Sequence, residues 1–265
     1  MAYDVPAELL VEEDGPVRIL TMNNPEQLNC FVDPLHQGMI GVWRQLADDP
    51  ECRAVVLTGA GRAFSAGGNL PGFILDYESQ EHRDQMFRNA RRLVDEMLAC
   101  HKPVIAAVNG PAVGLGASVA VLCDIVLIAD TAYMADTHVN VGLVAGDGGA
   151  MSWPLMMSIL KAKEYLFTGD RLSAADAVAV GLANRVVAAP ELQAEAKLLA
   201  HRIAAQPPQA VQETKRAVNL HLQRAAAMVL PFALSAESAS FTTDEVRQTA
   251  EKFKQREQPP NRHIA

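Results

Sequence analysis

The segment NGPAVGLGAS, residues 109–118, follows directly on the apolar run VIAAV of residues 104–108. A second segment, AFSAGGNL at residues 63–70, comes shortly after the apolar run AVVLT of residues 54–58. Short runs rich in β-branched residues are typical of strands that are covered on both faces. A helical pattern follows the glycines in both cases. The two segments therefore predict an α/β fold in which buried strands lead through glycine-rich turns into helices.

The glycines of these two turns also have a chemical meaning. Glycine lets the backbone approach a ligand closely, and a helix N-terminus presents N–H groups that favour negative charge. Two such turns that converge would form an oxyanion hole, in which amide donors meet a carbonyl oxygen as it gains charge. Either turn taken alone is equally consistent with an ordinary tight turn.

Several other motif classes fit this sequence poorly. The run GLGASV at 114–119 lacks the third glycine of a dinucleotide-binding fingerprint, and the lysine of a phosphate-binding P-loop is absent. Ser65 lies in AFSAG rather than in GxSxG, which disfavours a serine hydrolase. No metal site or disulfide framework is predicted, because CxxC spacing is absent among Cys30, Cys52, Cys100 and Cys123.

Composition limits the class of protein. A chain of 265 residues, 49% hydrophobic and 20% charged, is long enough to bury one large core. The net charge of −8, with no basic stripe longer than Arg91-Arg92, disfavours a nucleic-acid partner. The N-terminus lacks the order of a secretory signal, and the most apolar run, 111–129, is interrupted by glycine and aspartate. We therefore expect a cytoplasmic protein with no membrane segment.

Periodicity predicts the remaining elements of the first 190 residues. A helix is expected to begin at Asp33-Pro34, with Asp33 as its N-cap and with Leu35, Met39, Val42, Trp43 and Leu46 on its apolar face. Further helices are predicted over residues 79–100, 152–160, 161–169 and 176–180. Strands are predicted over residues 17–22, 125–129, 133–135 and 182–187.

The pattern becomes wholly helical near Pro190, so we divide the chain into an α/β core over residues 1–190 and a helical oligomerisation region over residues 191–265. Three alanine-rich amphipathic helices are predicted there, over residues 191–205, 208–226 and 231–256, separated by Pro207-Pro208 and by Pro231. Their apolar stripes must pack on the core or on another subunit, and the amount of apolar surface favours assembly.

A histidine and an aspartate stand nine residues apart in HVNVGLVAGDGG, residues 138–149. His138 and Asp147 are a plausible acid/base pair across an apolar, glycine-rich turn. The alternatives are a structural histidine in the core and an aspartate that caps the following helix.

Several stretches together resemble the crotonase (enoyl-CoA hydratase/isomerase) superfamily: VVLTGAGRAFSAGGNL, KPVIAAVNGPAVGLGASVAVLCDIVLIA, GLVAGDGG and TGDRLSAADAVAVGLANRVV. The resemblance covers nearly the whole chain. It implies a spiral of ββα units with a C-terminal helical domain, usually assembled as homotrimers or as paired trimers in homohexamers. The implied substrates are acyl-CoA thioesters, with coenzyme A as part of the substrate and no prosthetic group.

The resemblance also implies roles for individual residues. The backbone amides of Gly68 and Leu115 would be the oxyanion donors. A second set of residues would lie against coenzyme A: Gln27, Leu28, Ala66, Phe253 and Arg256. Of these, Phe253 and Arg256 would lie on a C-terminal helix that in this family often reaches a neighbouring subunit.

Two positions depart from the pattern of the hydratases in this family, which carry two catalytic glutamates. Ser118 and His138 stand at those positions, so ordinary hydration of a 2-enoyl thioester is not expected. The His138 and Asp147 pair instead resembles the branch that cleaves cyclic β-diketones hydrolytically.

In that branch's chemistry, His138, oriented by Asp147 on its other ring nitrogen, would deprotonate a water that attacks a ketone carbonyl. Ser118 would hydrogen-bond substrate or water, or else its own helix backbone. A protein that binds coenzyme A esters without hydratase turnover, and an oligomeric structural protein, are the alternatives.

Overall fold

The computed structural model describes residues 2–69 and 77–257, with side chains as far as residue 252. Within them the main sheet has the order β1-β2-β3-β4-β6-β9. Its strands are Leu9–Asp14, Val17–Met22, Ala54–Gly59, Val104–Val108, Ile125–Ala129 and Arg185–Val187. The pair β1 and β2 is antiparallel, and each later pair of neighbours is parallel. The predicted α/β fold is confirmed.

A smaller sheet has the order β5-β7-β8, formed by Ala112–Val113, Tyr133–Ala135 and Leu172–Ser173. Both β3 and β4 are buried along their whole length, as their continuous apolar runs predict for strands covered on two faces. The strand β1 was not predicted, because only Leu9 of its sequence LLVEED is buried. Val11 is only partly buried and the acidic residues follow directly, so the segment gives little alternating pattern to detect.

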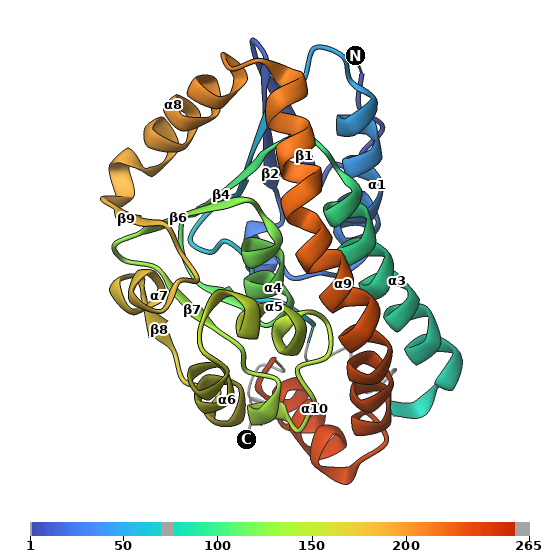
Figure 1. Cartoon of the computed structure of the whole chain (residues 1–265). Helices are drawn as coiled ribbons and strands as arrows, with labels where there is room; N and C mark the ends of the chain where they lie inside the picture. The colour runs from blue at the N-terminus through green and yellow to red at the C-terminus, as the bar shows by residue number, and fades with distance from the viewer. Residues whose placement is uncertain (1, 70–76, 258–265) are drawn as a thin grey trace, which may run out of the picture.

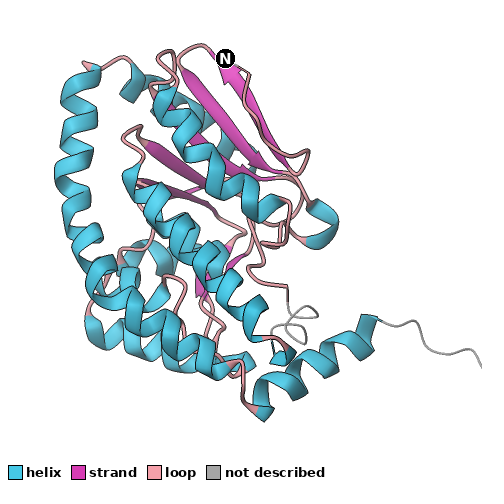
Figure 2. Cartoon of the chain, turned by 90° about the vertical axis from the view of Figure 1, so that its right-hand side faces the viewer, coloured by secondary structure: helices cyan, strands magenta, loops and turns pink. Residues whose placement is uncertain are grey.

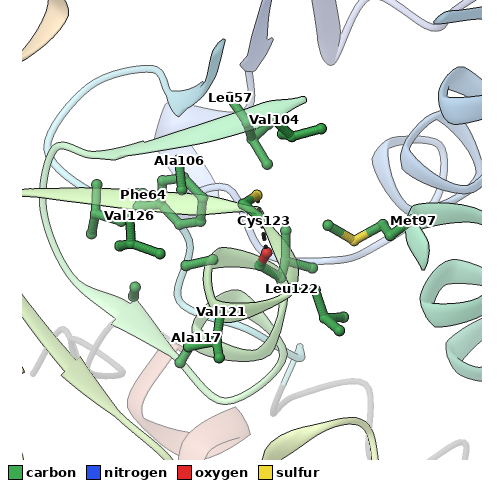
Figure 3. Close-up of a cluster of buried hydrophobic side chains, with 14 of the residues drawn as sticks. Leu57, Phe64, Met97, Val104, Ala106, Ala117, Val121, Leu122, Cys123 and Val126 are labelled. Atoms are coloured by element: carbon green, nitrogen blue, oxygen red, sulfur yellow. Dashed lines mark hydrogen bonds between the residues drawn. The ribbon is translucent and has the colours of Figure 1, made fainter. Parts of the chain in front are cut away.

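Helices cover both faces of the main sheet. α8, Leu192–Ala204, packs across β2, β3, β4 and β6, and its Gln193 donates a hydrogen bond from Nε2 to Thr58 Oγ1 at 2.8 Å. Neighbouring residues of a strand point to opposite faces. Leu57 therefore points away from α8, into the cluster with Phe64 and Ala117 in Figure 3. Ala117 belongs to α4, Leu115–Leu122, so α4 covers the second face.

Three further helices build a layer beyond α4. α3, Gln80–Ala99, packs against α1, Leu35–Asp48, and against α9, Pro208–Ser240. α9 also packs on α5, Gly149–Met156 (Figure 1). The C-terminal helices therefore bury much of their apolar surface against the chain's own core.

The remaining elements are short or lie at the far end of the molecule. They are α6 over Ile159–Thr168, α7 over Ala174–Val180, α10 over Asp244–Glu257, and the 3-10 turns η1 over Pro25–Gln27, η3 over Val139–Val141 and η4 over Ala189–Glu191. Figure 2 shows α10 at the end of the molecule away from the β1–β2 hairpin. In the described part of the chain no single helix has the length and apolar character of a membrane span, although α9 and α10, bent by 68°, pass that test as a pair.

The predicted break at Pro231 is wrong, because α9 continues through it to Ser240. A proline inside a helix costs about 3 kcal/mol. Leu230, Ala233 and Leu234 are all buried against the core, and the surrounding residues are strong helix formers. Packing on both sides of the proline therefore outweighs its local cost.

Two other predicted helix boundaries are also wrong. Pro34, and not Asp33, is the N-cap of α1, and it follows a cis peptide bond. The predicted helix over residues 152–160 is divided, since α5 ends at Met156 and Ser158 caps α6 by accepting a hydrogen bond from the Lys161 N–H at 3.2 Å. A serine in an apolar run was the available signal for this second boundary.

Candidate active site

The two glycine-rich turns lie side by side. Ser65 pairs with Ala112 in a parallel bridge, and the Val113 N–H donates to the Ser65 carbonyl at 2.9 Å. A Cβ on Gly67, where φ is +84°, would lie 2.5 Å from the Val113 carbonyl oxygen, and one on Gly116 would lie 2.5 Å from the Ser65 carbonyl oxygen. Glycine is therefore required for the close approach of the two backbones.

This approach places Gly68 and Leu115 on the same cavity, which has a volume of about 680 Å³. Leu115 is the first residue of α4, so its N–H has no partner inside the helix. The two turns thus converge on one cavity, which is the condition stated above for an oxyanion hole.

Replacing Gly67 by alanine is expected to lower the free energy of unfolding by about 1–3 kcal/mol, because the new Cβ meets the backbone of Val113 and Leu115 and φ is positive. The control is Gly41→Ala, on an exposed face of α1 with no atom within 4 Å of the new Cβ. That change is expected to stabilise by about 0.5–1 kcal/mol. Urea unfolding of both variants tests the packing, and equal stability of the two would contradict it.

Ser65 has a structural role in this arrangement. It is fully buried, its Oγ donates to the Asn29 carbonyl at 2.7 Å, and the same Oγ accepts from the Gly67 N–H at 3.2 Å. Both interactions hold the first turn in shape.

His138 lies just after β7 and lines the cavity, with 8% of its surface exposed. Its Nδ1 is 2.6 Å from Asp136 Oδ1, which also accepts the His138 backbone N–H at 3.3 Å. Asp147 approaches the other nitrogen, with Oδ2 3.3 Å from Nε2. The orienting carboxylate predicted from the sequence is therefore corrected: Asp136 holds Nδ1, and Asp147 lies with Nε2 on the cavity side.

Asp136 was not predicted from the sequence, although the spacing Asp-x-His directly after a predicted strand was the available signal. Along a short extended segment, residues two apart point the same way, so a carboxylate at this spacing can reach the ring. The aspartate two residues away in the sequence therefore holds His138 Nδ1, and Asp147, nine residues away, lies beside Nε2.

Asp147 is held by a residue of the second turn. The Ser118 Oγ donates to Asp147 Oδ1 at 3.3 Å, and Ser118 is fully buried. The hydrogen bond predicted from Ser118 to its own helix backbone is therefore replaced by a bond to Asp147, and the one predicted to substrate or water stays a prediction. Asp147 is also no helix cap, because Gly148 occupies the N-cap of α5.

Glu237 is a third carboxyl group at the site, contributed by α9. Its Oε1 is 3.8 Å from His138 Nε2, and its Oε2 is buried without a hydrogen-bond partner in the described structure. The sequence carried a signal for it. Leu230, Ala233, Leu234 and Glu237 follow the i, i+3, i+4, i+7 spacing of one helix face, so a glutamate there extends an apolar stripe into the core. The assumed break at Pro231 obscured that pattern.

Charge compensation shapes the ionisation of this cluster. Burial by itself would lower the pKa of His138, but the adjacent Asp136 and Asp147 carboxylates raise it well above its usual value. Burial, reinforced by Asp147, raises the pKa of Glu237 well above its usual value. The arrangement therefore favours a proton on Glu237 and makes His138 a stronger base than an exposed histidine.

The same three side chains are the residues that could hold a divalent cation. The candidate ligand atoms of His138, Asp147 and Glu237 all lie within 4.8 Å of one another. An imidazole with two carboxylates is a ligand set that several divalent metals accept.

The residues implied to contact coenzyme A are only partly placed. The Ala66 N–H donates to the Leu28 carbonyl at 2.9 Å, so these two residues are neighbours beside the first turn. Gln27 is exposed at the end of η1 and accepts a hydrogen bond from Asn24 Nδ2 at 3.2 Å. Phe253 and Arg256 belong to α10, and their side chains lie outside the described residues.

Comparison with known proteins gives consistent matches. The profile of the family described as enoyl-CoA hydratase/isomerase matches residues 12–263. A short-chain-enoyl-CoA hydratase of Clostridium acetobutylicum is 31% identical over 252 residues, which cover 92% of this chain and 94% of that protein.

Solved structures agree with these matches. The crystal structure of an enoyl-CoA hydratase/isomerase from Mycobacterium paratuberculosis has a TM-score of 0.91 and 51% identity, covering 94% of this chain and 100% of that one. An enoyl-CoA hydratase from Mycobacterium avium subsp. paratuberculosis has a TM-score of 0.85 and 30% identity, covering 96% and 98%.

Proposed function

This chain belongs to the enoyl-CoA hydratase/isomerase family of enzymes, and we propose that it hydrolyses a carbon–carbon bond in a β-dicarbonyl substrate. The observation that carries the proposal is the buried His138, held at Nδ1 by Asp136 and facing the cavity with Nε2. Gly68 and Leu115 line the same cavity, so a base and two amide donors can act on one carbonyl group.

The first step needs His138 as a neutral imidazole. The Nδ1–H donates to Asp136, which leaves the lone pair of Nε2 free to accept a proton. A water molecule in the cavity that hydrogen-bonds to Nε2 loses a proton to this nitrogen as its oxygen attacks one ketone carbon. The resulting alkoxide accepts hydrogen bonds from the amides of Gly68 and Leu115.

The second step breaks the carbon chain. Collapse of the alkoxide forms the carboxylic acid and breaks the bond to the carbon between the two carbonyl groups. The electron pair passes into the enolate of the second carbonyl. The proton on His138 then returns to that carbon, so a cyclic β-diketone takes up one water and its ring opens to a keto acid.

The site supports this reaction better than hydration of a 2-enoyl thioester. Ser118 and His138 stand where the hydratases of the family carry glutamates. Ser118 has no carboxylate, and its hydroxyl group is buried and donates to Asp147. It therefore cannot hold a water as a glutamate would. Glu237 does reach the cavity, but its raised pKa favours the protonated form.

The alternative is a protein that binds coenzyme A esters without hydratase turnover, and the contact between Ala66 and Leu28 favours it.

In both cases we expect no prosthetic group, and a homotrimer or homohexamer in the cytoplasm. Apolar side chains left exposed on α6 and α9 support assembly, among them Leu160, Phe167, Met228 and Phe232.

The test uses 2,2-dimethylcyclohexane-1,3-dione, a β-diketone that cannot enolise between its carbonyl groups. Hydrolysis is expected to give 6-methyl-5-oxoheptanoic acid, identified by proton NMR. Crotonyl-CoA is assayed in parallel and is expected to be hydrated slowly or not at all. Rapid hydration of crotonyl-CoA with the diketone untouched would refute the proposal, and binding of acyl-CoA without either product would favour the alternative.

A further inference from the structure

We propose that His36 binds the second carbonyl oxygen of the substrate, so that the site selects compounds with two carbonyl groups separated by one carbon. The inference rests on the proposed function and adds a specificity-determining residue to it. Nothing in the sequence pattern singled out His36.

His36 is a buried polar residue whose ring lacks one expected partner. It lies in the first turn of α1, is 8% exposed, and lines the same cavity as His138. Its Nε2 is buried and has no hydrogen-bond partner within the described structure. Buried polar atoms are nearly always hydrogen-bonded, so an orphaned nitrogen in a residue that lines a cavity points to a ligand atom as its partner.

The other orphaned atoms do not have this combination of properties. Trp43 Nε1, Trp153 Nε1 and Asp136 Oδ2 are buried without partners, but these residues do not line the cavity. Glu237 does line the cavity, but it already belongs to the cluster around His138. His36 is therefore the orphaned group that stands apart from the base and still reaches the substrate.

The chemical form of His36 suits a hydrogen-bond donor. Burial lowers its pKa, and although Asp33 and Asp147 oppose this effect, the net shift keeps the ring neutral at pH 7. Phe31 packs edge-on against the ring, with centroids 5.8 Å apart and planes at 81°, which limits its rotation. The proposal places the ring proton on Nε2, from which the neutral ring can donate one hydrogen bond to a ligand in the cavity.

The cleavage of a β-dicarbonyl needs such a donor. Negative charge forms first on the oxygen of the attacked carbonyl, where the amides of Gly68 and Leu115 act. When the carbon–carbon bond breaks, the charge moves to the oxygen of the second carbonyl. A 2-enoyl thioester has one carbonyl oxygen and would leave His36 Nε2 without a partner, at a cost in binding.

The test compares two ligands of nearly identical shape, 2,2-dimethylcyclohexane-1,3-dione and 2,2-dimethylcyclohexanone, which lacks the second oxygen. Dissociation constants are measured by calorimetry in a His138→Ala background, where turnover is expected to be about 10²–10⁴-fold slower. With His36 intact, the diketone is expected to bind about tenfold more tightly than the monoketone. His36→Phe should bring this ratio close to one, and His36→Gln, which keeps an N–H donor, should restore part of it.

Turnover provides the second measurement. In the presence of His138, His36→Phe is expected to lower kcat/KM for the diketone by about 10–10²-fold, since the donor meets a charged oxygen in the transition state. An unchanged binding ratio in His36→Phe, with native thermal unfolding, would overturn the role of His36. If the ratio depends on His36 while the wild-type protein forms no keto acid, the proposed function fails and the binding role stands.

Discussion

The His138→Ala variant is expected to hydrolyse the cyclic diketone with a kcat about 10²–10⁴-fold below that of the wild-type protein. The reason is the loss of the only imidazole held between Asp136 and Asp147 at the described cavity. Substrate binding should change little, because His36 and the apolar lining remain. The measurement is steady-state formation of the keto acid.

The matched control is His201→Ala. His201 forms an ion-pair contact with Asp14 at 3.2 Å, but both side chains are about 41% exposed and lie outside the cavity. Its activity is expected to equal that of the wild type. Because His138→Ala leaves buried carboxylates without a partner, His138→Asn is assayed as well, and full activity in a folded His138→Asn protein would remove His138 from the mechanism.

Asp136→Asn is expected to have the second-largest effect, a loss in kcat of about 10²–10³-fold. An asparagine can rotate to present its NH₂ group to Nδ1, which would favour the ring tautomer that carries its proton on Nε2. That tautomer cannot accept a proton from water at Nε2. It also loses the carboxylate that stabilises the imidazolium formed in the reaction.

Asp14→Asn is the control for Asp136→Asn, because it removes the same charge from an exposed histidine and aspartate pair. Its kcat is expected to be unchanged. Nitrogen NMR of the histidine rings provides a readout beyond activity, and the pKa of His138 should fall in Asp136→Asn. A variant with normal kcat and an unshifted His138 pKa would show that Asp136 has only a structural role.

Local patterns predicted much of the fold. The strands Val17–Met22, Val104–Val108, Ile125–Ala129 and Tyr133–Ala135 have the predicted bounds. For Val104–Val108 and Ile125–Ala129 the reason is that buried parallel strands leave continuous apolar runs in the sequence. The failures occurred where tertiary packing overrides local preference. Pro231 is the clearest case, since the contacts of Leu230 and Leu234 that keep α9 intact are invisible from neighbouring residues.

The site was predicted only where its residues belong to local sequence motifs. His138, Asp147 and the two glycine turns belong to local motifs, and the structure brings them to one cavity. Glu237 comes from a helix about a hundred residues further along the chain, and His36 looked like an ordinary residue of an amphipathic helix. Their importance depends on what they face in the folded chain.

The pH dependence of kcat/KM for the diketone tests the central claim most directly, that a neutral His138 is the base. Because the pKa of His138 is raised, the protonated and inactive form dominates at low pH. We predict that kcat/KM rises tenfold per pH unit up to an apparent pKa above 6.5, and that this apparent pKa is lower in Asp136→Asn. A wild-type profile that stays flat down to about pH 5 would identify a carboxylate as the base and contradict the account.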